Sequence, residues 1–471
     1  MSAASTPART ADPSEPAAPR PAAAARPDRT GPLTWVQQEW LPEQPDAQKS
    51  SHEDNQFRQL DIAPLGLGPV RSAVRAVLAR HEVLRSRIVG LGPQAHQAVD
   101  PVDPGWEQVL ETTALDVWDA AVAAARRTSF RLSRQWPLTL LAGTEDRHGR
   151  VSRIAMVVDH WAADGLGVVA LLDDLTAALQ AAALGVEWIP AGPVEQPIDL
   201  ALWESATPAG ADHLERSVAY RRQQFERLKR GLGDHRPSPG GGPLPGGTRL
   251  GFPGCTLTSV RLAEAATVVA DRLRVPAAAV FLAAFSTAIG AAEQVGIVGT
   301  FMLSANRLTP AALRSVRNAV MSAPVVLAVS PPGGFAETVV NAAAQQLQGL
   351  RYANTAPHLK HAVTEEVLGD LRHSGVASAI FNFMPESALR GDRVPAIVRD
   401  APCDVIEPMP VRGTAAERMV MVTLREDRVT ITLRWREDTS WQQHAEPMLR
   451  YTADLVLHEA APGPRPPVFG G

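Results

Sequence analysis

The chain has only two cysteines in 471 residues, Cys255 and Cys403, and it has no excess of basic residues. Two cysteines exclude a disulfide framework and a cysteine-rich metal site, and such low usage fits the reducing cytoplasm. The 46 basic and 50 acidic side chains give a net charge of −4. Because contact with a phosphate backbone needs a basic patch, no nucleic-acid partner is expected. The composition therefore predicts a cytoplasmic protein that acts without nucleic acid.

The sequence also lacks long hydrophobic runs of the kind that target or anchor a protein. Residues 1–30 are mostly Ala, Pro, Arg and Ser without an apolar core, so they predict a disordered tail and no secretory signal. The longest apolar stretch, residues 275–292, is mainly alanine and contains Pro276 and Gly290. Alanine contributes little to membrane insertion, so this stretch predicts a buried helix, and no membrane partner is expected.

Several familiar catalytic motifs are missing as well. The sequence contains no G-x-S-x-G, no G-x-x-x-x-G-K-[ST], no H-E-x-x-H and no C-x-x-C. These absences argue against a nucleophile elbow, a phosphate-binding loop, a helical zinc site and a paired-cysteine redox site.

Hydrophobic periodicity predicts strands and helices in mixed order along the whole chain, and this order is typical of α/β lobes. Ser440 to Gln443 has the form of a capping box that opens a last helix. The predicted parts are a disordered tail at 1–30, a first lobe at 31–190, a second lobe at 191–461 with a Pro/Gly linker at 231–250, and a flexible tail at 462–471. The predicted strands include 138–142, 154–158, 295–303, 325–329, 376–384, 419–425 and 429–435, and the predicted helices include 71–79, 116–127, 214–228, 263–273 and 276–292.

One segment, Asp159-His160-Trp161-Ala162-Ala163-Asp164-Gly165, places a histidine between a predicted strand and a predicted helix. The imidazole of His160 can take or give a proton near neutral pH, and a loop held by rigid elements is a common place for chemistry. Asp164 lies too far along the chain to orient the imidazole unless the loop folds back. It is therefore expected to pair with an arginine, while Gly165 permits the turn. Asp159 and His160 are expected to face opposite ways, because neighbours alternate at a strand end.

The residues alone leave other interpretations of this segment open. A single histidine beside a strand is usually structural and has no part in catalysis. A metal site built from Asp159, His160 and Asp164 is conceivable, but no second histidine lies nearby in the sequence. Zinc sites commonly use more than one histidine or cysteine, so no bound metal is expected.

Four segments, in order, resemble the core motifs of the condensation domains of nonribosomal peptide synthetases. Residues 159–165 resemble the HHxxxDG signature, whose HxxxDG part is shared with chloramphenicol-acetyltransferase-like acyltransferases. Residues 80–88, with the sequence RHEVLRSRI, resemble the RHExLRTxF motif. Residues 32–38, followed by Trp40, resemble the opening motif, and residues 436–439 resemble the closing strand and helix.

The resemblance extends from about Gly31 to Glu459 and implies an α/β fold. Two chloramphenicol-acetyltransferase-like sandwich lobes would form a V-shaped pseudo-dimer with a tunnel between them. His160 would be the catalytic residue at the tunnel centre, and Asp164 would form a structural salt bridge to an arginine of the second lobe. Arg307, which follows a predicted strand, is the candidate for that arginine.

The resemblance also implies the substrates. No cofactor is bound by the chain itself, because phosphopantetheine arrives on an acyl or peptidyl carrier protein. The chain has no carrier domain of its own, so this carrier would act in trans. The acceptor would be a small-molecule amine or alcohol.

The chain departs from the family pattern at several positions. Asp159 stands where the signature has its first histidine, and Gly167 stands where a serine often follows. Trp161 is bulky and is expected to narrow the tunnel. Residues 318–324 match the VGxFVNTxPxR pattern only faintly.

Three hypotheses about function follow. The leading one is a free-standing condensation-type acyltransferase that joins a carrier-bound acyl or aminoacyl thioester to an amine or hydroxyl in natural-product (antibiotic) biosynthesis. The second is an epimerase or a wax-ester or polyketide-associated acyltransferase of the same fold. The third is a degenerate, non-catalytic module that recruits carrier proteins or tailoring enzymes. Asp159 and the weak match at residues 318–324 favour this third hypothesis, and the retained His160, Asp164 and Gly165 oppose it.

Overall fold

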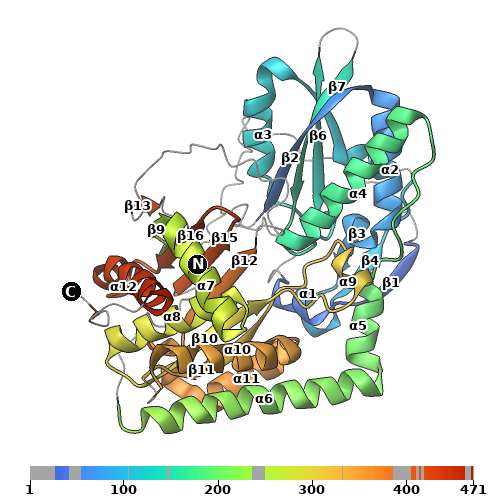
Figure 1. The fold of residues 1–471 in the computed structure, drawn as a ribbon. Coiled ribbons are helices and arrows are strands. Elements are labelled where there is room, and N and C mark those ends of the chain that lie inside the picture. Colours follow the sequence, from blue (N-terminus) through green and yellow to red (C-terminus); the bar gives the residue numbers. More distant parts are fainter. Residues whose placement is uncertain are drawn as a thin grey trace, which may run out of the picture.

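The computed structural model shows two α/β lobes, and within the described residues no sheet contains strands from both of them (Figure 1). The predicted fold class is therefore confirmed at the level of two separate α/β lobes. The described residues are 27–41, 55–103, 105–145, 149–235, 250–330, 333–385, 405–409, 413–414, 418–461 and 468–469.

The first lobe contains a four-stranded sheet flanked by helices. This sheet has the order β2 (Gln56–Gly66), β7 (Arg150–Val158), β6 (Leu138–Glu145), β5 (Leu110–Ala114), and a smaller sheet has the order β1 (Arg29–Pro32), β4 (His96–Val99), β3 (Ser86–Val89). The helices are α1 (Trp35–Glu39), α2 (Leu67–Arg80), α3 (Trp118–Arg126) and α4 (Gly165–Leu184). Helices α2 and α4 pack against each other on one side of the larger sheet, and α3 lies on the other side (Figure 1). A Cβ at Gly143 in β6 would lie 2.9 Å from the Trp118 ring, so this glycine allows α3 to approach closely.

The second lobe is built on a seven-stranded sheet. Its order is β11 (Met321–Ala328), β10 (Ile297–Ser304), β12 (Ala379–Pro385), β15 (Arg418–Leu424), β16 (Val429–Trp435), β9 (Gly254–Ser259), β13 (Val405–Met409). One face packs against α7 (Val260–Leu273), α8 (Ala277–Glu293), α10 (Gly334–Tyr352) and α12 (Gln442–Ala460), and the other face packs against α6 (Pro208–Leu232) and α11 (Pro357–Leu368). Along β11, Val325 and Leu327 join the first of these two cores and Val326 joins the second. This alternation is the period of two that a strand with both faces covered requires.

The remaining elements are short or connect the lobes. They are α5 (Pro197–Ala206), α9 (Pro310–Leu313), the strand pair β8 (Leu250–Gly251) and β14 (Gly413–Thr414), and the 3₁₀ helices η2 (Glu82–Arg85), η3 (Gly92–Gln94), η4 (Gly105–Val109), η5 (Leu115–Val117) and η6 (Gly369–His373).

The lobes meet where a loop of the second lobe reaches into the first. Residues 305–320, here called the crossover loop, leave the sheet after β10 and return to it as β11. The loop carries α9 to the side of α4 (Figure 1), and its Val316 is buried in the hydrophobic core of the first lobe. The segment after residue 190 also contacts both lobes, because α5 packs against β1 and the following α6 packs against β10 and β11.

Three predicted tail and linker boundaries are wrong. The tail expected at 1–30 is too long, because β1 begins at Arg29, whose guanidinium pairs with carboxylates of the first lobe and of α5. The linker expected at 231–250 is also too long, because α6 continues to Leu232 and β8 begins at Leu250. In the tail expected at 462–471, Phe469 packs edge-on against Tyr451 of α12. Residues 1–26, 236–249, 462–467 and 470–471 lie outside the described part of the chain.

The capping box expected at Ser440 does not form. Helix α12 follows Trp441, which has helical backbone angles and makes no capping hydrogen bond through its side chain. A capping box is present instead at the start of α1, where Thr34 Oγ1 accepts from the Gln37 backbone N–H and Gln37 Oε1 accepts from the Thr34 backbone N–H. This box fixes the short helix that leads to Trp40.

Among the described residues, one helix, α4, is long and apolar enough to cross a membrane by length and composition alone, and α7 with α8 would pass the same test as a pair bent by 107°. Helix α4 supplies Val168, Leu171, Leu172, Leu175 and other side chains to the core of the first lobe. Burial in that core accounts for its apolar composition.

Candidate functional site

His160 lies in a turn directly after β7, at the junction of the two lobes. Its ring is half-buried and stacks on Trp40 of the first lobe, with ring centroids 4.2 Å apart and planes at 7°. From the crossover loop, Asn318 Nδ2 donates to the His160 carbonyl oxygen over 2.8 Å and lies 3.2 Å from His160 Nδ1. The imidazole is therefore held by one residue from each lobe.

Asp159 is turned into the loop, where it determines the path of the backbone. The side chain is 1% exposed, and Oδ1 accepts from the Trp161 backbone N–H over 2.8 Å. The Asp159 carbonyl accepts from the backbone N–H groups of Ala162 and Ala163. A carboxylate at this position therefore has a structural function in the turn that carries His160.

Asp164 caps α4 and joins the lobes through a fully buried ion pair. Its Oδ1 accepts from the Gly167 backbone N–H over 2.7 Å. Its Oδ2 accepts from Arg307 Nη1 over 2.7 Å and from the Ala319 backbone N–H over 2.8 Å. The side chains of Asp164 and Arg307 are 2% and 1% exposed. The expected pair of Asp164 with Arg307 is therefore present.

Burial alone would favour the neutral carboxyl of Asp164, but its partners reverse this effect. The Arg307 guanidinium and the two backbone N–H donors hold the pKa of Asp164 below its ordinary value of 3.8. Arg307 Nη2 also donates to the Arg317 carbonyl oxygen over 2.7 Å, so the same guanidinium fixes both ends of the crossover loop.

The crossover loop is held by a second buried arginine, Arg317. Its Nη2 lies 2.6 Å from Glu195 Oε2, and it also donates to the Asn306 carbonyl oxygen. Burial lowers the pKa of Arg317, although the nearby Glu195 opposes that effect. Together with the Asp164–Arg307 pair, this contact fixes the position of Asn318, the next residue, against His160.

Gly165 and Gly167 have different surroundings, and Gly165 does not have the function that was expected of it. Gly165, expected to permit a turn, is the first residue of α4, is not among the glycines with positive φ, and would place a Cβ where no atom lies within 4 Å. At Gly167 a Cβ would lie 2.6 Å from the Arg317 carbonyl oxygen. The close approach of the crossover loop therefore requires glycine at 167, where the family often has serine, and not at 165.

Trp161 does not narrow a tunnel, contrary to expectation. Its side chain is fully buried and belongs to the hydrophobic core of the first lobe. It lies in the turn after β7, between the half-buried His160 and the buried Ala162. Its indole N–H has no hydrogen-bond partner in the part of the chain that the structure describes.

The RHEVLRSRI segment is structural in this fold. Arg80 Nε and His81 Nε2 both lie 2.8 Å from Asp174 Oδ2 of α4. These contacts link the end of α2 to α4, the helix that follows His160. His81 is 1% exposed, and burial lowers its pKa despite the neighbouring carboxylate. Glu82 receives two hydrogen bonds from Arg29 of β1.

Sequence reasoning missed the roles of Asn318, Arg317 and Gly167, and it named Trp40 only as part of a motif. The one available signal was the faint VGxFVNTxPxR match at 318–324. Asn318 and Ala319, the first two residues of this stretch, carry the contacts to His160 and Asp164.

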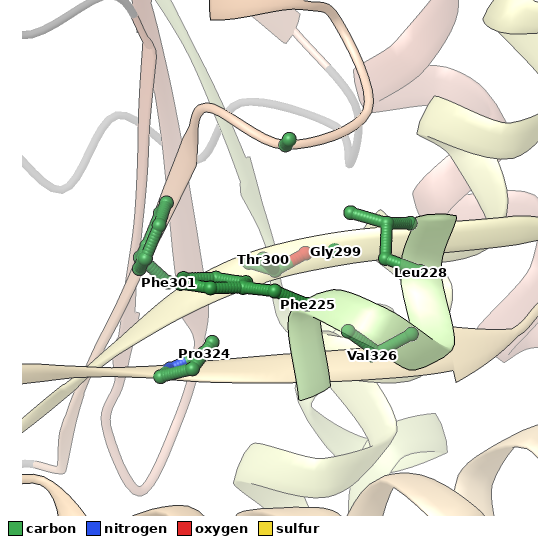
Figure 2. Close-up of a pocket in the computed structure, with 8 residues that line it drawn as sticks. Phe225, Leu228, Gly299, Thr300, Phe301, Pro324 and Val326 are labelled. Carbon is green, nitrogen blue, oxygen red and sulfur yellow. The ribbon is translucent and has the colours of Figure 1, made fainter. Parts of the chain in front are cut away.

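In the described residues no metal site marks a different centre. No group of three His, Cys, Asp or Glu side chains there could hold a metal ion. A small apolar cavity lies between α6 and strands β10 and β11, lined by Phe225, Leu228, Phe301, Val326 and neighbouring residues (Figure 2). Its volume of about 10 Å³ matches one water molecule, so it cannot hold a substrate.

Comparison with known proteins places this geometry in a known fold. No protein-family model matches the sequence. A stretch of 215 residues is 32% identical to a curated protein of Salinispora arenicola (strain CNS-205) named "Probable non-canonical nonribosomal peptide synthetase (NRPS) CymA". This match covers 42% of the chain and 3% of that protein's length.

Solved structures match over nearly the whole chain. A condensation domain that mediates chain release from the enacyloxin polyketide synthase has a TM-score of 0.68 at 16% identity, covering 96% of this chain and 86% of that one. The first condensation domain of the calcium-dependent antibiotic synthetase has a TM-score of 0.64 at 19% identity, covering 92% and 98%. The X-domain from teicoplanin biosynthesis, which is also known in a complex with OxyB, has a TM-score of 0.65 at 17% identity, covering 94% and 97%.

The chain is therefore a condensation-domain-like protein with the two-lobe, chloramphenicol-acetyltransferase-like fold of these domains. The expected fold and the expected resemblance are both confirmed. At these identities the structures establish the fold and leave the reaction open.

Proposed function

We propose that the chain is a condensation-type acyltransferase in natural-product biosynthesis, acting on a carrier-bound acyl or aminoacyl thioester with His160 as its catalytic residue. The observation that carries this proposal is the position of the imidazole. It lies at the end of β7, at the junction of the lobes, and is contacted by Trp40 from one lobe and Asn318 from the other. Such a position between rigid elements suits a group that must meet two substrates.

The proposed reaction joins the acyl group of the thioester to an amine or a hydroxyl. The carrier protein acts in trans and supplies its phosphopantetheine arm as part of the substrate. The domain contributes proximity, because holding the thioester and the nucleophile together supplies a large part of the acceleration. The low cysteine content supports the reducing cytoplasm as the place of this reaction.

The test uses the purified chain with carrier proteins loaded with candidate acyl groups, and it measures product by mass spectrometry. His160→Ala is expected to reduce condensation by about 10²–10⁴-fold, the usual contribution of a group that assists proton transfer or hydrogen bonding. His96→Ala in β4 is the matched control, because within the described part of the chain the imidazole of His96 has one polar contact, 3.4 Å to the Gln94 carbonyl oxygen. Equal rates for wild type and His160→Ala, above the uncatalysed background, would remove His160 from the mechanism.

A second function, recruitment without catalysis, is favoured by one observation. Asp159 replaces the first histidine of the signature and is buried in the loop as a structural group. The matching X-domain, known in a complex with OxyB, supports a partner-binding use of this fold. Tight binding of loaded carrier proteins or of a tailoring enzyme, with no product from any donor, would favour recruitment over transfer.

A further inference from the structure

The contacts of Asn318 determine which nitrogen of His160 can carry the proton. The Asn318 side chain is buried, and its two ends face different groups. Its Nδ2 donates to the His160 carbonyl oxygen over 2.8 Å, and its Oδ1 accepts from the Val320 backbone N–H over 3.1 Å. A flipped amide would place two oxygen atoms at 2.8 Å and two N–H donors against each other, so only one orientation satisfies this network.

The same amide nitrogen lies 3.2 Å from His160 Nδ1. An amide nitrogen only donates, so the ring nitrogen that faces it has to accept. A neutral imidazole with Nδ1 as its acceptor carries its proton on Nε2. The stacked Trp40 ring restricts rotation of the imidazole without selecting a tautomer, since a ring face contacts both nitrogens alike.

We infer that Asn318 is a positioning residue that holds His160 in the Nε2–H tautomer, so that the imidazole presents a hydrogen-bond donor to the reacting thioester. This role rests on the proposed function, whereas the tautomer itself does not. A donor at Nε2 suits the carbonyl oxygen of the thioester, where negative charge develops during acyl transfer. It does not suit removal of a proton from the nucleophile, which needs an unprotonated Nε2.

The reaction balances without a base on this ring. The lone pair of the amine nitrogen forms the C–N bond, and the carbonyl π electrons move to oxygen, where the Nε2–H of His160 stabilises them. Collapse of this intermediate restores the C=O bond and breaks the C–S bond, so the electron pair leaves on sulfur. The proton lost by the amine passes to the pantetheine thiolate, and the products are an amide and a thiol.

The tautomer can be measured directly, without a substrate, on the full chain. The protein is labelled with ¹⁵N-histidine, and long-range ¹H–¹⁵N correlation spectra are recorded at a pH where the ring is neutral. The chain has 12 histidines, so the His160 signals are assigned by their loss in His160→Gln. The expected result is an excess of roughly tenfold of the Nε2–H form, the effect of one net hydrogen bond.

Two asparagine variants test the cause. Asn318→Asp replaces the donor with a carboxylate acceptor and is expected to move the proton of His160 to Nδ1. Asn306→Asp is the matched control, because Asn306 lies in the same loop and donates to the Ala319 carbonyl oxygen, while the contacts to His160 come from Asn318. This control is expected to leave the tautomer as in wild type.

Each outcome decides the inference. A predominant Nδ1–H form in wild type would overturn it, and so would an unchanged tautomer in a folded Asn318→Asp. If Asn318→Asp does not fold, Asn318→Ala takes its place, and an Nε2–H excess unchanged from wild type in that variant would overturn the inference. An Nδ1–H tautomer in a protein that forms product would contradict this inference and leave the proposed acyl transfer intact. Absence of product together with the Nε2–H form would contradict the proposed acyl transfer and leave this inference intact.

Discussion

Removal of the Asp164 carboxylate is the sharpest test of how the two lobes are held together. In Asp164→Leu, the buried Arg307 loses the carboxylate 2.7 Å away, and the backbone N–H groups of Gly167 and Ala319 lose their acceptors. Breaking a buried pair by removing one partner costs about 3–5 kcal/mol, because an uncompensated charge stays buried. For a lobe of this size such a loss lowers Tm by roughly 10 °C.

The assay is thermal unfolding by calorimetry, with two comparisons. Asp103→Ala removes an ion pair to Arg75 in which both side chains are more than half exposed, so Tm is expected to stay unchanged. The double variant Asp164→Leu with Arg307→Leu is expected to be less destabilised than the sum of the two single variants, because it leaves no unpaired charge. Additive effects, or an unchanged Tm in Asp164→Leu, would refute the reasoning.

The same ion pair predicts a pH dependence. The pKa of Asp164 is lower in the folded chain than its ordinary value of 3.8. A lowered carboxyl pKa contributes stability that is fully present above the unfolded value and is lost as the pH falls through the folded value. The difference in Tm between wild type and Asp164→Leu is therefore constant from pH 5 to neutrality and shrinks below about pH 4.

Three further predictions concern neighbouring residues. Gly167→Ala is expected to lower the free energy of unfolding by about 1–3 kcal/mol, because its Cβ would meet the Arg317 carbonyl oxygen. Gly165→Ala, which has free space at its Cβ, is expected to be neutral or slightly stabilising in the same melting assay. Burial raises the pKa of Glu204 to about 7 from its ordinary 4.5. The wild type is therefore expected to lose stability between pH 5 and 8 relative to Glu204→Gln. Parallel curves of Tm against pH for the two proteins would contradict this. Trp161→Ala is expected to cost about 3–5 kcal/mol as a core truncation, and a variant with wild-type Tm would show that the ring lies outside the core.

Much of the fold follows from the sequence because its signals are local. Short apolar runs predicted β6 and β7, and the longest apolar stretch predicted α8, each within a few residues. These strands and α8 are buried over most of their length, so they show in the sequence as apolar runs that can be read without knowing what lies opposite. The boundaries were less well predicted, because the end of α6 and the start of β1 depend on contacts with distant segments.

The candidate site likewise has a part that the sequence predicted and a part that it did not. The strand, the turn with His160, and the helix that Asp164 caps are consecutive in the chain, so the sequence by itself determined that they lie together. The resemblance to condensation domains also suggested Arg307 as the partner of Asp164, because it follows a predicted strand of the second lobe where that family carries an arginine.

Only the tertiary structure decided what surrounds the histidine. Asn318 is 158 residues from His160, and Gly167 is needed only because the crossover loop approaches it. Trp161 is buried in the core of the first lobe because of the path that the chain takes in the turn after β7. These contacts depend on how two lobes dock, and docking is set by the sum of many weak long-range interactions that leave no periodic trace in the sequence.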